Sequence, residues 1–281
     1  MKKISMTLLA GIIFVILSAC NLSSNASENN KIVVGSSGSD AQVWNFISKS
    51  KAAKDAGIEI EVKEFNDGLQ INEATNDGKL DVNAFQSLSY FQDYVKSKDA
   101  DLVAIATTYL EPMGIYSENL KSVENIPENA EIAIPNDPAN TARALRVLRN
   151  AGVITLKDDF DSFGTIQDIV ENPKNIKFVP VDGSSTARSL PDVDASLIGN
   201  SVALDAGLNS IKDSIYHEEI NQDTQANINI LVTQKENEKD KNLNKLSSIY
   251  HSKEVQDFIK KEFGGTKIPV KKPVEEIVNN Q

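Results

Sequence analysis

The sequence predicts an α/β protein built from alternating strands and helices. Short β-branched runs are followed by segments with helical periodicity, the pattern of strand–helix–strand units around mainly parallel sheets. The pattern starts again after residue 117, and the body of about 250 residues suits one large domain or two smaller ones. No period of about 20 to 50 residues recurs, so a solenoid is not expected.

The first series of elements covers the first third of the body. A strand is expected at 31–34, followed by a helix over 41–56 that ends at Gly57. Residues 58–65 alternate with period two, as a half-buried strand does, and 102–107 is a further strand. These segments form one α/β unit.

The second series begins after the segment EPMGIYS. Its expected elements are a strand at 131–134, a helix at 138–150 and strands at 177–181 and 195–198. The chain then returns to a strand at 227–232 and ends in helical sequence that includes 253–263.

Because the chain ends in a strand and helices, it can return to complete a first lobe after building a second. Two crossings between lobes are then expected, near residues 108–113 and 222–228. We expect one lobe of residues 31–110 plus 226–281, and another of residues 111–225. A hinge of two crossings gives a cleft that can close around a ligand.

The first 19 residues are interpreted as a signal peptide. Two lysines follow the initial methionine, and Thr7–Leu17 is an apolar stretch too short to span a bilayer. The motif LSAC ends at Cys20, the chain's only cysteine, and matches a bacterial lipoprotein cleavage box in which this thiol receives the lipid. Residues 20–30 are polar and are expected to form a flexible tether behind that lipid.

The charge balance excludes one class of partner. Acidic residues outnumber basic ones by 40 to 29, and loss of the two signal-peptide lysines leaves 27, a mature net charge of about −13. Such a chain repels phosphate backbones, so no nucleic-acid partner is expected. The acidity is interpreted as a solubility feature.

The inventory of catalytic groups is thin. His217 and His251, the only histidines, lie in polar stretches and are expected to be solvated. No HExxH, CxxC or GxSxG motif is present, so we expect no enzymatic activity, no metal ion and no cofactor.

The turn GSSGSD after the first strand allows two interpretations. Its glycines and hydroxyls, leading into a helix, can direct backbone N–H groups at an anion. A tight strand-to-helix turn capped by Ser39 explains the same residues without a ligand. The spacing is not GxGxxG and no P-loop lysine follows, so a nucleotide site is not indicated.

The segment PNDPANTARAL is a candidate carboxylate receptor. Asp137 or Asn140 can cap a helix, and Pro138 fits its first turn. Arg143 then presents a planar donor fork near the positively polarised helix start. The alternative is a surface arginine on an amphipathic helix, which is how we interpret Arg146 and Arg149.

The segment DVNAFQSLSYFQDY places Phe85 and Tyr90 around an expected strand-to-helix junction. Aromatic side chains there can line an apolar pocket, because α/β ligand sites lie at the carboxyl ends of sheet strands. They can equally be core residues.

Together these segments resemble the NlpA/MetQ family of methionine-binding lipoproteins, the receptors of methionine-type ABC importers. The resemblance rests on LSAC, DVNAFQ, EPMGIYS, AIPNDPANTARAL, DIVENPKNIKFV, ALDAGL and NINILV, which occur in family order across nearly the whole mature chain. It implies a two-lobed periplasmic-binding-protein fold, type II-like, with the ligand cleft at the hinge.

The resemblance also implies which residues face the ligand. The arginine and asparagine of the family's PNDPxNxxRAL segment correspond to Arg143 and Asn140. The asparagine of the returning strand corresponds to Asn229, and the aromatic residues of the DxNxFQ segment correspond to Phe85 and Tyr90.

Four positions depart from the family pattern. A pocket tyrosine is replaced by Gly68 and a pocket histidine by Ser87. A further histidine is replaced by Tyr109, and the family's INGNYA-like segment becomes IGNSVA, which contains Asn200. The resemblance therefore implies that the grip on the amino-acid backbone is kept while the side-chain pocket is altered.

We therefore expect a lipid-anchored receptor on the outer face of the cell membrane, with an acylated, palmitate-type anchor at Cys20. It is expected to act as a monomer, to capture methionine or a related amino acid, and to deliver it to an ABC permease served by a separate ATPase. A methionine-containing dipeptide is the alternative ligand, because Gly68 and Ser87 enlarge or polarise the site. A surface adhesin needs no closing cleft, and an extracellular hydrolase lacks a visible nucleophile with a base.

Overall fold

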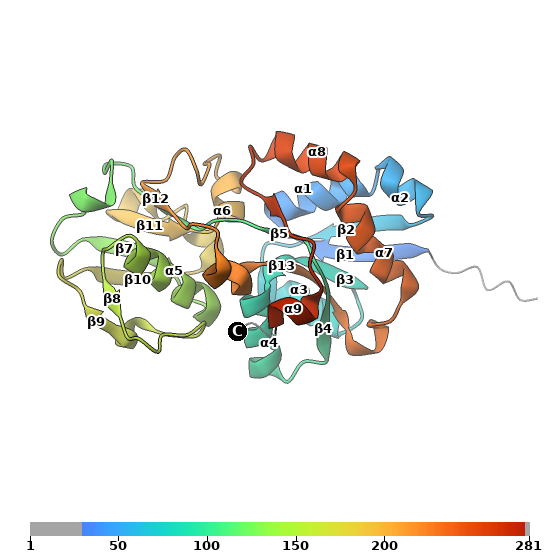
Figure 1. Ribbon diagram of the computed structural model, residues 1–281, viewed down its shortest axis with the longest axis horizontal. Coiled ribbons are helices and arrows are strands. Elements are labelled where there is room, and N and C mark those ends of the chain that lie inside the picture. The colour runs from blue at the N-terminus through green and yellow to red at the C-terminus, as the bar shows by residue number, and fades with distance from the viewer. Residues whose placement is uncertain (1–29, 279–281) are drawn as a thin grey trace, which may run out of the picture. The chain divides into compact units, whose positions relative to one another are not determined.

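The computed structural model describes residues 30–278 (Figure 1). The expected signal peptide, Cys20 and nearly all of the expected tether lie outside these residues. Within residues 30–278, none of the helices combines the length and the apolar character that a membrane span requires.

The strands form two five-stranded sheets and two small two-stranded ones. Their bounds are β1 Lys31–Ser36, β2 Glu59–Glu64, β3 Val82–Ser87, β4 Leu102–Thr107, β5 Tyr109–Leu110, β6 Gly114–Tyr116, β7 Glu131–Pro135, β8 Thr155–Leu156, β9 Ile169–Glu171, β10 Lys177–Val181, β11 Ala195–Ile198, β12 Tyr216–His217, β13 Asn229–Gln234 and β14 Ile268–Pro269.

The helices lie between these strands and after them. Their bounds are α1 Gly38–Ile47, α2 Lys51–Asp55, α3 Gly68–Asn76, α4 Leu88–Lys98, α5 Pro138–Asn150, α6 Asn200–Asp205, α7 Lys241–Tyr250, α8 Lys253–Glu262 and α9 Val274–Val278. Short 3-10 turns lie at η1 Val123–Asn125, η2 Ile166–Asp168, η3 Gly183–Ser185, η4 Leu190–Asp192, η5 Gln222–Asn227 and η6 Lys235–Asn237.

The first large sheet has the strand order β2-β1-β3-β13-β4. Strand β1 pairs in parallel with β2 and β3, whereas β13 pairs antiparallel with both β3 and β4. The chain thus places a late strand between two early ones. The sheet is mixed because β13 enters it from the opposite direction.

The second large sheet has the order β10-β7-β11-β6-β12. Its parallel pairs join β7 to β10 and to β11, and its antiparallel pairs join β6 to β11 and to β12. All five strands come from one continuous stretch, residues 114–217. The expectation of parallel strands therefore holds for half of the pairings in each sheet.

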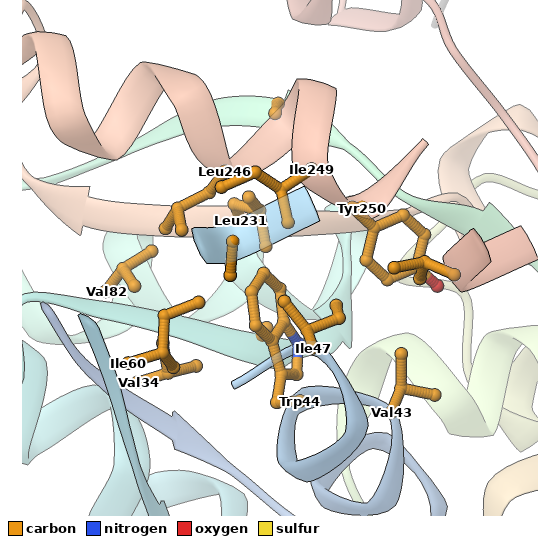
Figure 2. Packing of buried hydrophobic residues seen from close by; sticks show 14 of the residues in the cluster. Val34, Val43, Trp44, Ile47, Ile60, Val82, Leu231, Leu246, Ile249 and Tyr250 are labelled. Atoms are coloured by element: carbon orange, nitrogen blue, oxygen red, sulfur yellow. The ribbon is translucent and has the colours of Figure 1, made fainter. Parts of the chain in front are cut away.

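Each sheet is the centre of its own apolar core. Side chains of β1, β2, β3 and β13 meet those of α1 and α7, and Figure 2 shows Trp44, Ile47, Leu231 and Leu246 converging there. A further cluster joins α4 and β13 to α9. The second sheet packs against α5, whose Leu145 is fully buried.

Several sequence expectations are confirmed residue by residue. The bounds of β4, β10, β11 and α5 are those predicted. Helix α5 begins where expected because Asp137 accepts a hydrogen bond from the Asn140 backbone at 2.9 Å and Pro138 occupies its first turn.

The single helix predicted over 41–56 is wrong, because the segment forms two helices. The Ser50 hydroxyl accepts a hydrogen bond from the Ala53 backbone, which caps a new helix at Lys51. Apolar spacing alone does not reveal this break, since the apolar residues continue in phase across it.

Candidate functional site

A cavity of about 740 Å³ is lined by residues from both large sheets and their helices. Its walls include the carboxyl ends of β3, β7 and β11, the first turns of α3, α4 and α5, and the start of β13. Ligand sites of α/β proteins occupy this end of the strands. The cavity size falls within the range of about 300–1,000 Å³ typical of small-molecule pockets.

Seven of the eight residues expected to bind ligand line this single cavity. They are Gly68, Phe85, Ser87, Tyr90, Asn140, Arg143 and Asn229. They come from five elements that are up to 161 residues apart in sequence, since Gly68 and Asn229 lie on the same cavity. The structure thus brings them together.

Arg143 lies in the second turn of α5, is 7% exposed, and reaches the cavity wall. Its Nη2 donates to Glu218 at 2.6 Å and to the Glu111 carbonyl at 2.6 Å. Its Nε donates to the same Glu218 carboxylate at 3.1 Å. Within the described part of the chain, Nη1 is left without a hydrogen bond.

Asn140 and Asp137 form a second polar patch one turn earlier on α5. The Asn140 amide nitrogen donates to both oxygens of Asp137, at 3.1 and 3.0 Å. Burial raises the pKa of the Asp137 carboxyl, although these hydrogen bonds act in the opposite direction. The sequence pattern identifies Asp137 only as a helix cap, and the structure also places it on the cavity wall.

Asn229 opens β13 opposite Ser87 of β3. Its backbone carbonyl accepts a hydrogen bond from Thr108 at 2.9 Å. The side chain lines the cavity, the residue is only 6% exposed, and its amide has no hydrogen-bond partner among residues 30–278. A buried amide of this kind is a ready donor and acceptor for a ligand.

Phe85 and Tyr90 form the aromatic wall. Their ring centroids are 6.0 Å apart in an edge-to-face arrangement at 77°. A Cβ at Gly68 would lie 2.7 Å from Phe85 Cε2 and 3.0 Å from the Tyr90 hydroxyl, so this pair occupies the space next to a glycine. Burial, then the nearby carboxylates of Asp137 and Asp67, raise the pKa of Tyr90, which keeps its hydroxyl protonated.

Ser87 has a structural role as well as a place on the wall. Its hydroxyl accepts a hydrogen bond from the Tyr90 backbone at 3.3 Å and is the N-cap of α4. The hydroxyl therefore fixes the start of the helix that carries Tyr90.

Asn200 is the expected site residue that the structure does not place on the cavity wall. It is 1% exposed, and its amide nitrogen donates to Glu111 at 2.9 Å and to Thr266 at 3.1 Å. Its amide oxygen accepts from Ser210 at 2.6 Å. The side chain is fully used in a hydrogen-bond network whose members Glu111 and Ser201 line the cavity.

That network contains a buried ion cluster, which we call the Lys267 cluster: Lys267, Asp40 and Glu111. The Lys267 ammonium donates to Asp40 at 2.9 Å, to Glu111 at 3.0 Å and to Ser201 at 3.0 Å. It also lies 4.1 Å from the centroid of the Tyr109 ring. Sequence reasoning missed the cluster because its members are 71 to 227 residues apart.

The turn GSSGSD therefore belongs to this cluster rather than to a ligand site. Its N-cap residue is Ser37, not Ser39, and Asp40 points to Lys267. None of its residues lines the cavity. Both an anion-binding role and a Ser39 cap are thus unsupported by the geometry.

Glu218 is the other residue that sequence reasoning missed. It is 6% exposed and pairs with Arg143, 75 residues earlier in the chain. The repeated acidic letters IYHEE gave no local sign that one carboxylate is buried and its neighbour Glu219 exposed. Long-range pairing of this kind has no signal in one sequence.

Arg146, Arg149 and His251 are more buried than expected. Arg146 donates to the Asp161 carbonyl at 3.1 Å and lies 6.0 Å from the Phe160 ring centroid. Arg149 is half-buried at the other end of α5. His251 Nε2 lies 3.0 Å from the Thr107 carbonyl oxygen, and burial lowers the pKa of its imidazole.

Titratable side chains also do not assemble a metal centre in the described residues. Among the side chains described in residues 30–221 and 224–278 there is no group of three or more histidine, cysteine, aspartate or glutamate residues placed to hold an ion. The cavity wall instead carries one arginine, four asparagines, three aromatic residues and several carboxylates.

Comparison with known proteins identifies the kind of protein that has this architecture. The family model for the NlpA lipoproteins matches residues 32–271. The D-methionine-binding lipoprotein MetQ of Escherichia coli K12 is 34% identical over 236 residues, which cover 83% of this chain and 84% of that protein.

Solved structures agree. Protein PG110 from Staphylococcus aureus is similar at a TM-score of 0.84 and 37% identity, covering 89% of this chain and 98% of that one. A nutrient-binding protein from Burkholderia cenocepacia, bound to methionine, is similar at a TM-score of 0.81 and 38% identity, covering 85% and 99%. With a family model over most of its length and relatives above 30% identity, this chain belongs to the NlpA lipoprotein family.

Proposed function

We propose that this protein is the substrate-binding component of an ABC importer, capturing methionine or a related amino acid and delivering it to a permease. The observation that carries the proposal is the cavity in which Arg143, Asn229 and the Phe85–Tyr90 pair meet. Its methionine-binding relatives cover more than four fifths of the chain. The protein then acts by binding and release, without catalysis of its own.

The polar end of a free amino acid is matched by groups on opposite walls. A zwitterion that enters a buried site loses its hydration, so each charge needs a fixed partner there. We propose that Arg143 Nη1 takes the α-carboxylate together with the unpartnered amide of Asn229. The ammonium group then lies toward Asp137 and Asn140, whose carboxylate and amide oxygens accept hydrogen bonds.

The apolar end of the ligand is matched by the aromatic wall. Phe85, Tyr90 and the buried Met113 line the cavity. A thioether side chain packs favourably at the edge of aromatic rings, at about 0.3–1.5 kcal/mol per contact. This part of the cavity favours a methionine-like side chain over a charged one.

Binding is proposed to close two lobes, residues 31–110 plus 226–281 and residues 111–225. Cavity residues come from both large sheets, so a ligand touches both only when the lobes are closed, and this gives it a higher affinity for that state. Solution scattering on ligand-stripped protein should show a smaller radius of gyration when L-methionine is added. An unchanged radius despite calorimetric binding contradicts closure.

A short methionine-containing peptide is the second candidate ligand. The observation that favours it is Gly68, beside which Phe85 and Tyr90 occupy space that a larger residue would take. These rings lie closer to α3 than a larger side chain at position 68 would allow, and the cavity of about 740 Å³ leaves room for a ligand of two residues.

One experiment tests the proposed function and separates the two ligands. Mass spectrometry of small molecules released by denaturing the purified protein identifies what it carries. Calorimetric titration of refolded, stripped protein with L-methionine and with glycyl-L-methionine then ranks them. Binding of neither, with no released ligand, contradicts the proposal.

Anchoring is the remaining part of the proposal. Cys20 is proposed to carry the lipid that holds the protein on the outer face of the membrane, because acyl-chain burial contributes about 0.8 kcal/mol per CH₂. We expect a Cys20→Ser protein to leave the membrane fraction. Full retention of that variant in the membrane contradicts lipid anchoring at this residue.

A further inference from the structure

The guanidinium of Arg143 is hydrogen-bonded to a carboxylate, Glu218, that is not part of the cavity wall. Glu218 accepts from Arg143 Nη2 at 2.6 Å and from Nε at 3.1 Å, and it is absent from the cavity wall. The Glu111 carbonyl takes a second hydrogen bond from Nη2. One edge of the guanidinium is therefore fixed to protein, and Nη1 of this cavity-lining residue has no hydrogen-bond partner among the described residues.

Glu218 is itself fixed by two further donors. The Met113 backbone N–H donates to it at 3.3 Å, and the Asn227 amide nitrogen donates at 3.0 Å. Met113 lies between β5 and β6, and Asn227 immediately precedes Ile228 and β13. These are the two segments through which the chain passes from one large sheet to the other.

The donor set explains why this position requires a carboxylate. All four groups that reach Glu218 are N–H donors, and an ionised carboxylate is an acceptor at both oxygens. A glutamine at this position would turn its NH₂ group toward at least one donor. The arginine would then lose the support that fixes its orientation.

We propose that Glu218 is a positioning residue for ligand recognition, setting the guanidinium edge that Arg143 offers to a ligand carboxylate and tying it to both connecting segments. This rests on the proposed function, because it concerns the same cavity. It adds a residue outside the cavity that determines selectivity for a free carboxylate.

Two roles of Glu218, positioning the guanidinium or only neutralising its charge, predict changes of opposite sign in the selectivity for a carboxylate over an amide. If Glu218 only neutralised Arg143, its removal would leave the arginine charge uncompensated, and attraction for a ligand carboxylate would increase. If Glu218 positions the guanidinium, its removal weakens the directional contact that distinguishes a carboxylate from an amide. The sign of the change separates the two roles.

The measurement is the selectivity ratio, the Kd for L-methioninamide divided by the Kd for L-methionine, obtained by calorimetry. In Glu218→Gln we expect this ratio to fall about tenfold to a hundredfold, by analogy with outer partners of metal ligands. The matched control is Glu219→Gln, the same charge change at the exposed neighbouring residue. That variant should keep the ratio of the parent protein.

Each outcome decides the proposal. A ratio in Glu218→Gln that is unchanged or higher overturns the positioning role. If this variant does not fold, Asn227→Ala replaces it, since it removes one donor to Glu218 and leaves the cavity wall intact. There we expect the ratio to fall at least about threefold, and no change overturns the proposal.

A failure of the proposed function is recognisable separately. The parent protein is titrated with L-methionine and with glycyl-L-methionine. For the compound that binds, the selectivity ratio is the Kd of its C-terminal amide divided by the Kd of the free acid. If the parent binds neither compound, the proposed function fails and the role of Glu218 fails with it. If the parent binds and only the ratio is unaffected by Glu218→Gln, the function stands and the role of Glu218 is wrong.

Discussion

Two buried arrangements of charge lie close together in this protein, and only one of them is left incomplete. In the Lys267 cluster, the ammonium makes three hydrogen bonds, to Asp40, Glu111 and Ser201, and none of its N–H groups is left for a ligand. In the pair of Arg143 and Glu218, the carboxylate accepts from four N–H groups, whereas Nη1 of the guanidinium has no hydrogen-bond partner among the described residues.

The difference teaches how burial of charge serves two purposes in one fold. A closed cluster fixes elements: Asp40 lies on α1, Glu111 lies on a connecting segment, and Lys267 lies in the C-terminal part. The pair of Arg143 and Glu218, which we call the open pair, instead leaves one guanidinium nitrogen available to a ligand. The two share Glu111, whose carboxylate binds Lys267 and whose carbonyl binds Arg143.

The largest expected effect breaks the closed cluster. Lys267→Met leaves two carboxylates buried without their cation, and removal of one partner of a buried ion pair costs about 3–5 kcal/mol of unfolding free energy. Urea denaturation measures this, with Lys271→Met at an exposed position as the control. A loss below about 1 kcal/mol would show that Lys267 does not hold the cluster together.

The second effect breaks the open pair. Arg143→Ala should weaken L-methionine binding by about 2–5 kcal/mol, or about 30-fold to several thousand-fold, because the ligand carboxylate is left buried and unpaired. The control is Arg149→Ala, on the same helix but away from the cavity. It is preferred to Arg146→Ala because Arg146 contacts the Phe160 ring. Binding within about threefold of the parent rules out the carboxylate role.

A third test adds one methyl group beside the Lys267 cluster and one at the aromatic wall of the cavity. Gly38 has a φ of +46°, and its Cβ would meet the Asp205 carboxylate beside the Lys267 cluster, so Gly38→Ala should lose about 1–3 kcal/mol of stability. Gly68→Ala should instead push Phe85 and Tyr90 toward the cavity and change ligand affinity more than stability. The two variants are compared by urea denaturation and by calorimetric titration. Equal changes in stability and in ligand affinity would contradict the different roles of the two positions.

The smallest effect is a pH dependence. Burial alone would lower the pKa of Lys267, but Asp40 and Glu111 outweigh it and raise that pKa above 10.5. A raised lysine pKa contributes stability that is fully present below 10.5 and is lost as the pH rises through the folded-state pKa. The difference in unfolding free energy between the parent and Lys267→Met should therefore shrink above pH 10.5. If the difference in unfolding free energy grows above pH 10.5, the pKa of Lys267 is not raised by its carboxylate partners.

Local signals account for what could be predicted from the sequence. Helix α5 was predictable because Asp137 and Pro138 define its start, and the site residues Arg143 and Asn229 followed from the family resemblance. The partners of these residues were not predictable. Glu218 is 75 residues from Arg143, and Lys267 is 227 residues from Asp40, so no spacing rule connects them.

The order of strands in the first sheet has a consequence for how the chain acquires its structure. Strand β13 lies between β3 and β4, so that sheet cannot close until residues 229–234 have been synthesised. The second sheet needs only the continuous stretch 114–217. We expect the second sheet to be able to form first, while the edges of β3 and β4 stay unpaired until β13 is available.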